Sequence, residues 1–472
     1  MKKEVSFWLA LLPLIIMITA MAVTIVGLKG DPHLPLMIGT AAAAIIAKQA
    51  GFTWKDIEES MYKGIKLALP AIVIIILVGL TIGSWIGGGI VATMVFYGLK
   101  MMTPSLFLVS ICIICAVVCL AIGSSWSTMA TIGVAGMGIG LSMGLPAAMI
   151  AGAVISGAYF GDKLSPLSDT TNLASGLTGT DLFEHIKFML ITTIPSLLIA
   201  LMVYWLLGRS YIEGKAASLA DIENTMLALQ SNFVISPWLL LIPLAVIVLC
   251  MFKVPAVPAL VVGIVLGSFS QLFIQGDALN IAVSTLQNGY AIESENSMVN
   301  ELFNGGGIEA MMYTVSLTIV AMTFGGVLEN TGMLEIIVQR ISKIAKTAKR
   351  LIITTVFSSF ATNISCSEQY ISIVVPARMY AKSYENQNLH SKNLSRAIED
   401  GGTLTSVFVP WNTCGVFIFA TLGVHAFQYA PYAILNFTVP LLSIILTLLG
   451  RSIVYRNPNK KIDALKQTKK VI

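Results

Sequence analysis

The sequence is poor in charge. Only 11% of its 472 residues are Asp, Glu, Lys or Arg, and 56% are hydrophobic, whereas an ordinary soluble domain is about 25% charged. A soluble globule of this length could not cover so much apolar surface with polar side chains. The composition therefore excludes an ordinary soluble protein and indicates that lipid surrounds much of the chain. The net charge of +5 is small and gives no reason to expect nucleic-acid binding.

The sequence also lacks the motifs of most enzymes and ATP-driven pumps. It contains no Walker motif, dinucleotide fingerprint or HExxH sequence. Its four histidines are scattered, with no carboxylate at helical spacing inside an apolar run. Cys112, Cys115 and Cys119 share an apolar stretch without polar metal ligands, so we expect them to be packing residues. We therefore expect neither an enzyme nor a bound cofactor.

What the sequence does contain is a series of long apolar runs. They are continuous rather than alternating, which favours helices over a β-barrel. The fold class we expect is an all-α polytopic membrane protein with about 10–13 transmembrane segments and discontinuous helices. The first run, Phe7 to Gly27, is longer than the apolar core of a signal peptide, which favours a retained span.

Basic residues predict the orientation, because Lys and Arg gather in cytoplasmic loops. The loop from Gln275 to Gly307 carries four acidic residues and no basic one, so we place it outside. The segments predicted to be cytoplasmic contain Lys2, Lys3, Arg340, Lys343, Lys346, Lys349, Arg350 and the tail from Arg451 onward. Both termini are then cytoplasmic.

Three features recur at nearly one spacing. The sequence Thr-Ile-Gly at 81–83 has a counterpart, Thr-Phe-Gly, 242 positions later, and Ser-Trp-Ser at 125–127 has Ser-Cys-Ser 240 positions later. Asp162 has Asp400, 238 positions later. Equivalent loops carry opposite charge, which indicates an inverted repeat. We therefore divide the chain into residues 1–235, with repeat 1 at about 67–207, and 236–472, with repeat 2 at about 308–450.

The most polar membrane-flanked segment is GAYFGDKLSPLSDTTNLA at residues 157–174. Pro166 should interrupt a helix there, and unwound backbone at membrane depth is tolerated where it lines a cavity or is buried in protein. Carboxylate, hydroxyl and carbonyl oxygens suit a small hard cation such as Na⁺. The first-choice ion-binding residues are Asp169, Asp162, Ser165, Ser168, Thr170, Thr171 and Asn172. The alternative is an ordinary polar loop in which Asp169 caps the next helix.

A second set of candidates comes from the corresponding breaks of the two repeats. These segments are rich in hydroxyl groups and resemble the tips of re-entrant hairpins, although close helix packing would also use small residues. Glu368 stands out because a carboxylate inside a membrane is costly without a role. The second-choice residues are Ser125, Ser127, Ser365, Ser367, Glu368, Asp400, Asn412 and Thr413.

Together, GSSWST (123–128), residues 157–174 and EDGGTLTSVFVPWNTCG (399–415) resemble the NhaC family of bacterial Na⁺/H⁺ antiporters over essentially the whole chain. The resemblance implies a bacterial cytoplasmic-membrane protein that exports Na⁺ and takes up H⁺, with Asp162 and Asp169 at the ion site. It is also compatible with transport of Li⁺ and with assembly as a homodimer. Some relatives are similar to malate–lactate exchangers.

Two mechanisms remain open at this point. In the first, Na⁺ and H⁺ compete for one buried carboxylate, with Asp169 favoured over Asp162. In the second, a small organic acid is exchanged together with the ions. The central motifs contain no arginine, and Lys163 is the one basic residue beside Asp162, which favours cations.

Overall fold

A computed structural model describes residues 5–28, 30–101, 103–215, 219–252, 254–342, 345 and 347–456. Within these ranges the chain is helical, and pairing between extended segments is limited to isolated bridges such as Tyr290 with Gly305. The all-α fold class is therefore confirmed. Some of the basic residues that predict the orientation lie outside the described residues, among them Lys2, Lys343, Lys346 and the tail after residue 456.

The first half contains α1 Phe7–Met21, η1 Ala22–Gly27, α2 His33–Gln49, α3 Trp54–Gly87, α4 Ile90–Met101, α5 Pro104–Ile122, α6 Ser125–Thr128, η2 Met129–Gly133, α7 Val134–Ser142, α8 Ala147–Leu164, α9 Asp169–Thr178, α10 Leu182–Lys215 and α11 Leu219–Asn232. The second half begins with η3 Pro237–Leu240, α12 Leu241–Met251, α13 Ala256–Phe273, α14 Leu279–Asn288, α15 Ser297–Phe303, α16 Gly307–Asn330 and α17 Met333–Ser342. It ends with α18 Ala348–Cys366, α19 Gln369–Asn386, α20 Ser391–Ile398, η4 Glu399–Thr403, η5 Ser406–Phe408, α21 Thr413–Leu422, α22 Ala426–Tyr429, η6 Ala430–Tyr432 and α23 Ile434–Leu448.

Six helices of the described chain are long and apolar enough to cross a membrane, or up to nine if each bent helix pair is one span. The bent pairs confirm that helices are discontinuous, with bends of 91° after α11, 47° before α21 and 63° before α23. The count is below the expected 10–13 because it leaves out shorter or more polar helices such as α4 and α8.

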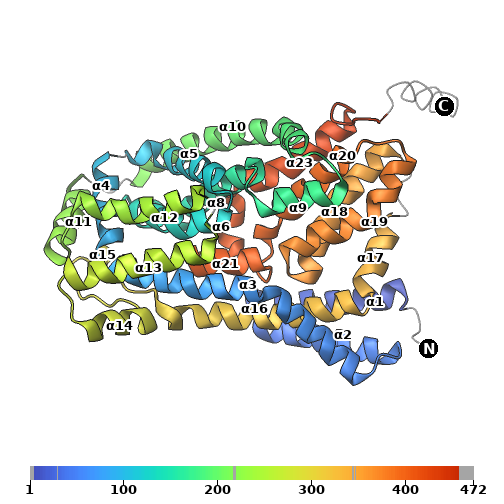
Figure 1. Cartoon of the computed structure of the whole chain (residues 1–472), viewed down its shortest axis with the longest axis horizontal. Helices are drawn as coiled ribbons and strands as arrows, with labels where there is room; N and C mark the ends of the chain where they lie inside the picture. Colours follow the sequence, from blue (N-terminus) through green and yellow to red (C-terminus); the bar gives the residue numbers. More distant parts are fainter. Residues whose placement is uncertain are drawn as a thin grey trace.

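Helices α3 and α16 form a long antiparallel pair in the lower part of Figure 1, beside α13. Glycines allow the close approach. A Cβ on Gly64 would overlap the carbonyl oxygen of Met322, and a Cβ on Gly79 would overlap that of Gly307. Small residues at such crossings are typical of membrane helices. Within this pair, α3 supplies apolar residues that line the cavity described below.

Two helix breaks have nearly the same backbone. After α5, Gly123 is left-handed (φ 80°, ψ 20°) and Ser124 is extended (φ −144°, ψ 114°). After α18, Ser367 is left-handed (φ 59°, ψ 16°) and Glu368 is extended (φ −139°, ψ 127°). A left-handed residue is usually glycine, so the left-handed conformation of Ser367 is uncommon for a serine. Each break turns the chain and presents polar groups to the interior.

The second pair of breaks involves proline. Helix α8 ends at Leu164, and α9 begins at Asp169 after Pro166, which confirms the expected interruption. In the second half, η5 ends at Phe408, and α21 begins after Pro410. The four breaks bring polar backbone and side chains together near the centre of the molecule.

Candidate functional site

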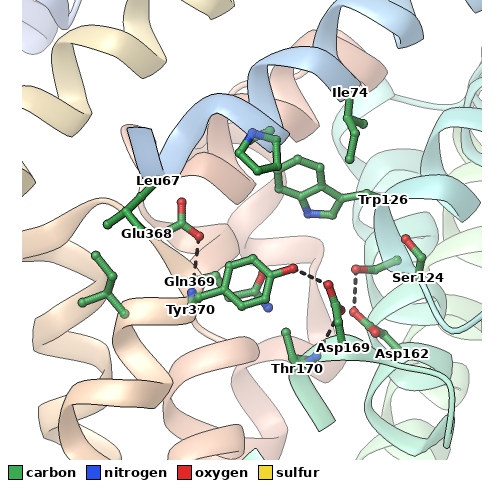
Figure 2. A pocket seen from close by; sticks show the side chains of 14 residues that line it. Leu67, Ile74, Ser124, Trp126, Asp162, Asp169, Thr170, Glu368, Gln369 and Tyr370 are labelled. Carbon is green, nitrogen blue, oxygen red and sulfur yellow. Dashed lines mark hydrogen bonds between the residues drawn. The ribbon is translucent and has the colours of Figure 1, made fainter. Parts of the chain in front are cut away.

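A cavity of about 360 Å³ lies where three of these breaks meet α3 (Figure 2). Its lining includes the carboxylates of Asp162 and Asp169, which lie near each other, and that of Glu368, which lies across Tyr370 from them in Figure 2. Leu67 and other apolar residues of α3 also line the cavity. Residues from both halves of the chain therefore line one cavity.

Asp162, in the last turn of α8, is the more buried of the two aspartates. It is only 3% exposed. Its Oδ2 accepts a hydrogen bond of 2.7 Å from the hydroxyl of Ser125, which starts α6. Its Oδ1 receives no hydrogen bond from the described residues. A buried carboxylate oxygen without a donor is unfavourable, so this atom is well placed to take a proton or a cation.

Asp169 is in a different environment. It is exposed, at the start of α9. Its Oδ1 accepts from the backbone N–H of Thr170 at 3.0 Å, and its Oδ2 accepts from the hydroxyl of Tyr370 on α19 (Figure 2). Ser168, not Asp169, is the N-cap, because its hydroxyl accepts from the N–H of Thr171. Both oxygens of Asp169 thus already have protein donors.

Glu368 is the third carboxylate and caps α19. It is 5% exposed, and its Oε1 accepts from the N–H of Tyr370 at 3.3 Å. A helix N-terminus stabilises a carboxylate through its free N–H groups. The neighbouring Ser367 hydroxyl is buried without a hydrogen-bond partner among the described residues.

Most other first-choice residues hold the break together and do not line the cavity. The Ser165 hydroxyl donates to the carbonyl of Leu120 at 2.9 Å, and Thr171 donates to the carbonyl of Lys163 at 3.2 Å. Asn172 donates to two carbonyls of the same turn. Thr170 does line the cavity. The structure therefore brings together Asp162, Asp169 and Thr170 of the first set with Ser125 and Glu368 of the second.

The remaining second-choice residues do not line the cavity. Ser127 contacts the Ser124 hydroxyl at 3.2 Å, and Ser365 donates to a carbonyl one turn earlier. Asn412 caps α21, and Thr413 follows it with a buried hydroxyl that has no described partner. Asp400 lies in a separate ion pair with Lys163, at 2.6 Å. These residues stabilise the surroundings of the cavity.

Comparison with known proteins decides the family. A family model described as the Na⁺/H⁺ antiporter family matches residues 157–451. The chain belongs to the Na⁺/H⁺ antiporter family. It is 39% identical to a Na⁺/H⁺ antiporter NhaC of Alkalihalophilus pseudofirmus over 95% of this chain and 97% of that protein. It is 36% identical to an NhaC of Bacillus subtilis over 94% of this chain and 98% of that protein. The resemblance to NhaC antiporters is confirmed.

Another relative has a different printed activity. A Malate-2H⁺/Na⁺-lactate antiporter of Bacillus subtilis is 37% identical over 90% of this chain and 91% of that protein. All three relatives are named as transporters, so the chain belongs with multi-pass membrane transporters.

Several residues in or beside the cavity are not singled out by the sequence. Trp126 and Tyr370 line the cavity. Glu399 is fully buried, and its Oε1 accepts from the hydroxyl of Thr170 at 3.3 Å. Arg396 is also fully buried, with its Nε 3.7 Å from Asp400. Two of these residues could have been found from their place in the sequence, because Glu399 directly precedes the candidate Asp400 and Tyr370 follows the candidate Glu368 by two residues.

No three His, Cys, Asp or Glu residues in the described ranges are grouped as chelators of a resident metal ion. The cavity instead offers carboxylates that are spread over its surface, together with the hydroxyls of Ser125 and Thr170. Such oxygen ligands suit a weakly held, transported cation.

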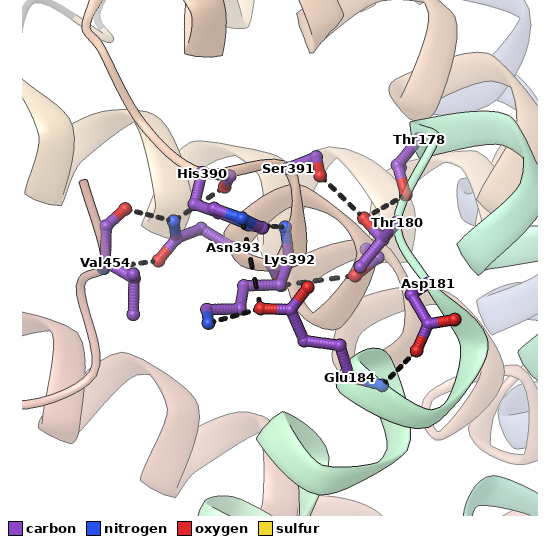
Figure 3. A network of polar contacts seen from close by, with 10 residues as sticks. Thr178, Thr180, Asp181, Glu184, His390, Ser391, Lys392, Asn393 and Val454 are labelled. Carbon is purple, nitrogen blue, oxygen red and sulfur yellow. Dashed lines mark hydrogen bonds and ion pairs between the residues drawn. The ribbon is translucent and has the colours of Figure 1, made fainter. Parts of the chain in front are cut away.

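A polar network connects the two halves at the far end of α9 and α20 (Figure 3). Glu184 accepts from Lys392 at 2.7 Å and lies 3.9 Å from the ring of His390. The hydroxyl of Thr180 donates to Ser391 at 2.9 Å. The network fixes the α9–α10 connection against the start of α20, the helix that also carries Arg396.

The four histidines are not all at the surface. His185 is fully buried in α10, and neither ring nitrogen has a hydrogen-bond partner among the described residues. Helix packing therefore encloses the His185 ring.

Proposed function

We propose that this chain exchanges cytoplasmic Na⁺ for external H⁺ in the cytoplasmic membrane of a bacterium, with both termini in the cytoplasm. The names of its NhaC relatives support the two ions. The cavity supports a cationic substrate, because its lining includes three carboxylates and no Lys, Arg or His. Li⁺ is a natural second ion to test, and a homodimer stays a prediction.

The observation that carries the mechanism is the free Oδ1 of Asp162. A proton or a Na⁺ ion would satisfy this atom, but both cannot occupy the carboxylate at once. The Ser125 hydroxyl, 2.7 Å from Oδ2, can rotate to offer its own lone pairs to Na⁺. Exclusive occupancy couples the two fluxes. This argument places Asp162 ahead of Asp169, reversing the order favoured by the sequence.

An inverted repeat would supply alternating access to this site. Three structural correspondences support a repeat. In each, equivalent residues lie 244 positions apart, whereas the sequence motifs alone indicate 238–242. The left-handed breaks at Gly123 and Ser367 are one equivalent pair, and the caps Ser168 and Asn412 are another. The third concerns helix contacts. A Cβ on Gly157 would overlap the backbone of Cys112, and a Cβ on Gly401 would overlap that of Val356. The two glycines are 244 residues apart, and so are the two residues that they contact.

The organic-acid exchanger is the second candidate, favoured by the malate–lactate relative. A carboxylate substrate would need a cationic or N–H donor surface. Lys163 does not line the cavity and is paired with Asp400. An acid would therefore face three carboxylates without a counter-charge, and cation exchange is the better proposal.

The test is dissipation of ΔpH in everted vesicles from an antiporter-deficient strain. NaCl alone should elicit the response, and LiCl is added in parallel. Asp162→Asn should abolish it at unchanged membrane abundance, whereas Asp169→Asn should retain it with an altered half-saturating Na⁺ concentration. Glu293→Gln, an exposed carboxylate of the 275–307 loop, is the matched control.

Two results would contradict the proposal. A response that requires Na-lactate or Na-malate would establish the organic-acid exchanger instead. Normal exchange by Asp162→Asn would show that the shared carboxylate lies elsewhere.

A further inference from the structure

The cavity is larger than a Na⁺ ion requires. Its volume is about 360 Å³, within the range of about 300–1,000 Å³ typical of small-molecule sites. One water occupies about 30 Å³, and a bare monovalent ion needs no more. The cavity therefore has room for an organic ligand next to its carboxylates.

The lining of the cavity is divided by chemistry. Asp162 and Asp169 form the acidic side, and the free Oδ1 of Asp162 is buried there. Leu67, Pro70 and Ile74 of α3 contribute apolar lining, and Figure 2 shows Leu67 and Ile74 along this helix. A hydrated ion gains nothing from an apolar wall, whereas a cation with hydrocarbon groups buries them against it.

Two aromatic rings complete the lining. Trp126 is fixed by stacking on Phe417, with ring centroids 4.2 Å apart and planes 10° from parallel. Tyr370 is fixed by its hydroxyl contact with Asp169. Electron-rich ring faces attract organic cations, and alkylammonium groups especially. The rings are held in place before any ligand arrives, which reduces the entropy lost on binding.

We propose that this cavity binds small alkylammonium cations in competition with Na⁺, with the charged nitrogen toward Asp162 and the alkyl groups against α3 and Trp126. This inference rests on the proposed function in taking Na⁺ as the competing ion. It goes beyond that function in assigning a second class of ligand to the cavity.

Choline is a suitable probe because a quaternary ammonium has no dissociable proton and does not collapse ΔpH by diffusing through the lipid as a neutral amine does. Its effect is measured on ²²Na⁺ uptake into everted vesicles. The matched control is 3,3-dimethyl-1-butanol, a neutral molecule of the same shape. Choline should raise the apparent KM for Na⁺ without lowering the maximal rate, and the alcohol should have no effect. Equal effects of the two, or no choline effect at about a hundred times the Na⁺ KM, would overturn the inference.

Thermal stability of the purified protein gives a readout that does not depend on Na⁺ transport. A ligand that binds the folded state raises the melting temperature. Stabilisation by choline but not by the alcohol supports the inference even if Na⁺ uptake is absent, in which case the proposed function fails alone. Absence of choline-specific stabilisation, with Na⁺ uptake intact, overturns the inference alone.

A variant pair locates the site. Trp126→Leu keeps an apolar side chain but removes the ring, and should raise the ratio of the choline inhibition constant to the Na⁺ KM about 5- to 30-fold. Phe357→Leu removes an exposed ring of α18 and should leave this ratio unchanged. An unchanged ratio in Trp126→Leu would show that choline does not bind in this cavity.

Discussion

Neutralising Asp400 is predicted to destabilise the protein by about 3–5 kcal/mol. Its Oδ1 lies 2.6 Å from the Lys163 ammonium, and its Oδ2 lies 3.7 Å from Nε of Arg396, with all three side chains fully buried. Asp400→Asn would leave two buried cations without this counter-charge. The cost comes from the stranded charges more than from the lost contact.

The distances set the expected order of the variants. At an effective dielectric constant of about 20, Coulomb attraction is about 6 kcal/mol for the lysine contact and about 4 kcal/mol for the arginine contact, before desolvation is subtracted. Lys163→Met leaves Asp400 beside Arg396, so it should cost less than Asp400→Asn. Removing both partners should cost less than the sum of the single changes, because no member of the pair is stranded.

The assay is equilibrium unfolding of purified variants in detergent micelles. Glu385→Gln is the matched control, since its ion pair with Arg456 has a distance of 3.3 Å but is about half exposed; it should change stability by less than about 1 kcal/mol. The reasoning is refuted if Asp400→Asn costs as little as the control. Single changes that add to within about 0.5 kcal/mol in the double variant would also refute it.

Two further predictions use the same assay. Gly157→Ala should cost about 1–3 kcal/mol, because the new Cβ would overlap the backbone at Cys112; Gly176→Ala, where nothing lies within 4 Å, should be neutral or stabilising, and equal effects would contradict the packing argument. Lys392→Met should cost at most about 1 kcal/mol, because its partner Glu184 is 41% exposed; the loss should shrink in high salt, and a salt-independent loss would point to packing instead.

Several local features of the fold follow from the sequence. Pro166 ends α8 because proline removes a backbone donor and clashes with the preceding turn. Gly123 ends α5 because glycine adopts the left-handed conformation without a Cβ penalty. The equivalent break at Ser367 was placed from its hydroxyl-rich surroundings, although its left-handed conformation has no glycine to predict it.

The contents of the cavity were only partly predictable. Asp162 and Asp169 are predictable because they lie among hydroxyl groups in a proline-broken segment whose oxygens suit a small cation, and Glu368 because a carboxylate inside a membrane is costly without a role. The sequence could not predict which of the two aspartates has a free oxygen. That depends on Tyr370, which lies 201 residues from Asp169 along the chain and donates a hydrogen bond to it. Lys163 looked like a neighbour of the ion site, but its side chain turns to Asp400, 237 residues away.

The sequence by itself determined that this is a helical membrane protein with broken helices, because composition and prolines act through the solvent and the local backbone. The tertiary structure alone decided which carboxylate has a free oxygen, which charges pair and which rings line the cavity. These properties depend on contacts between distant segments. Local chain chemistry constrains such contacts only weakly, since packing of whole helices decides which side chains meet.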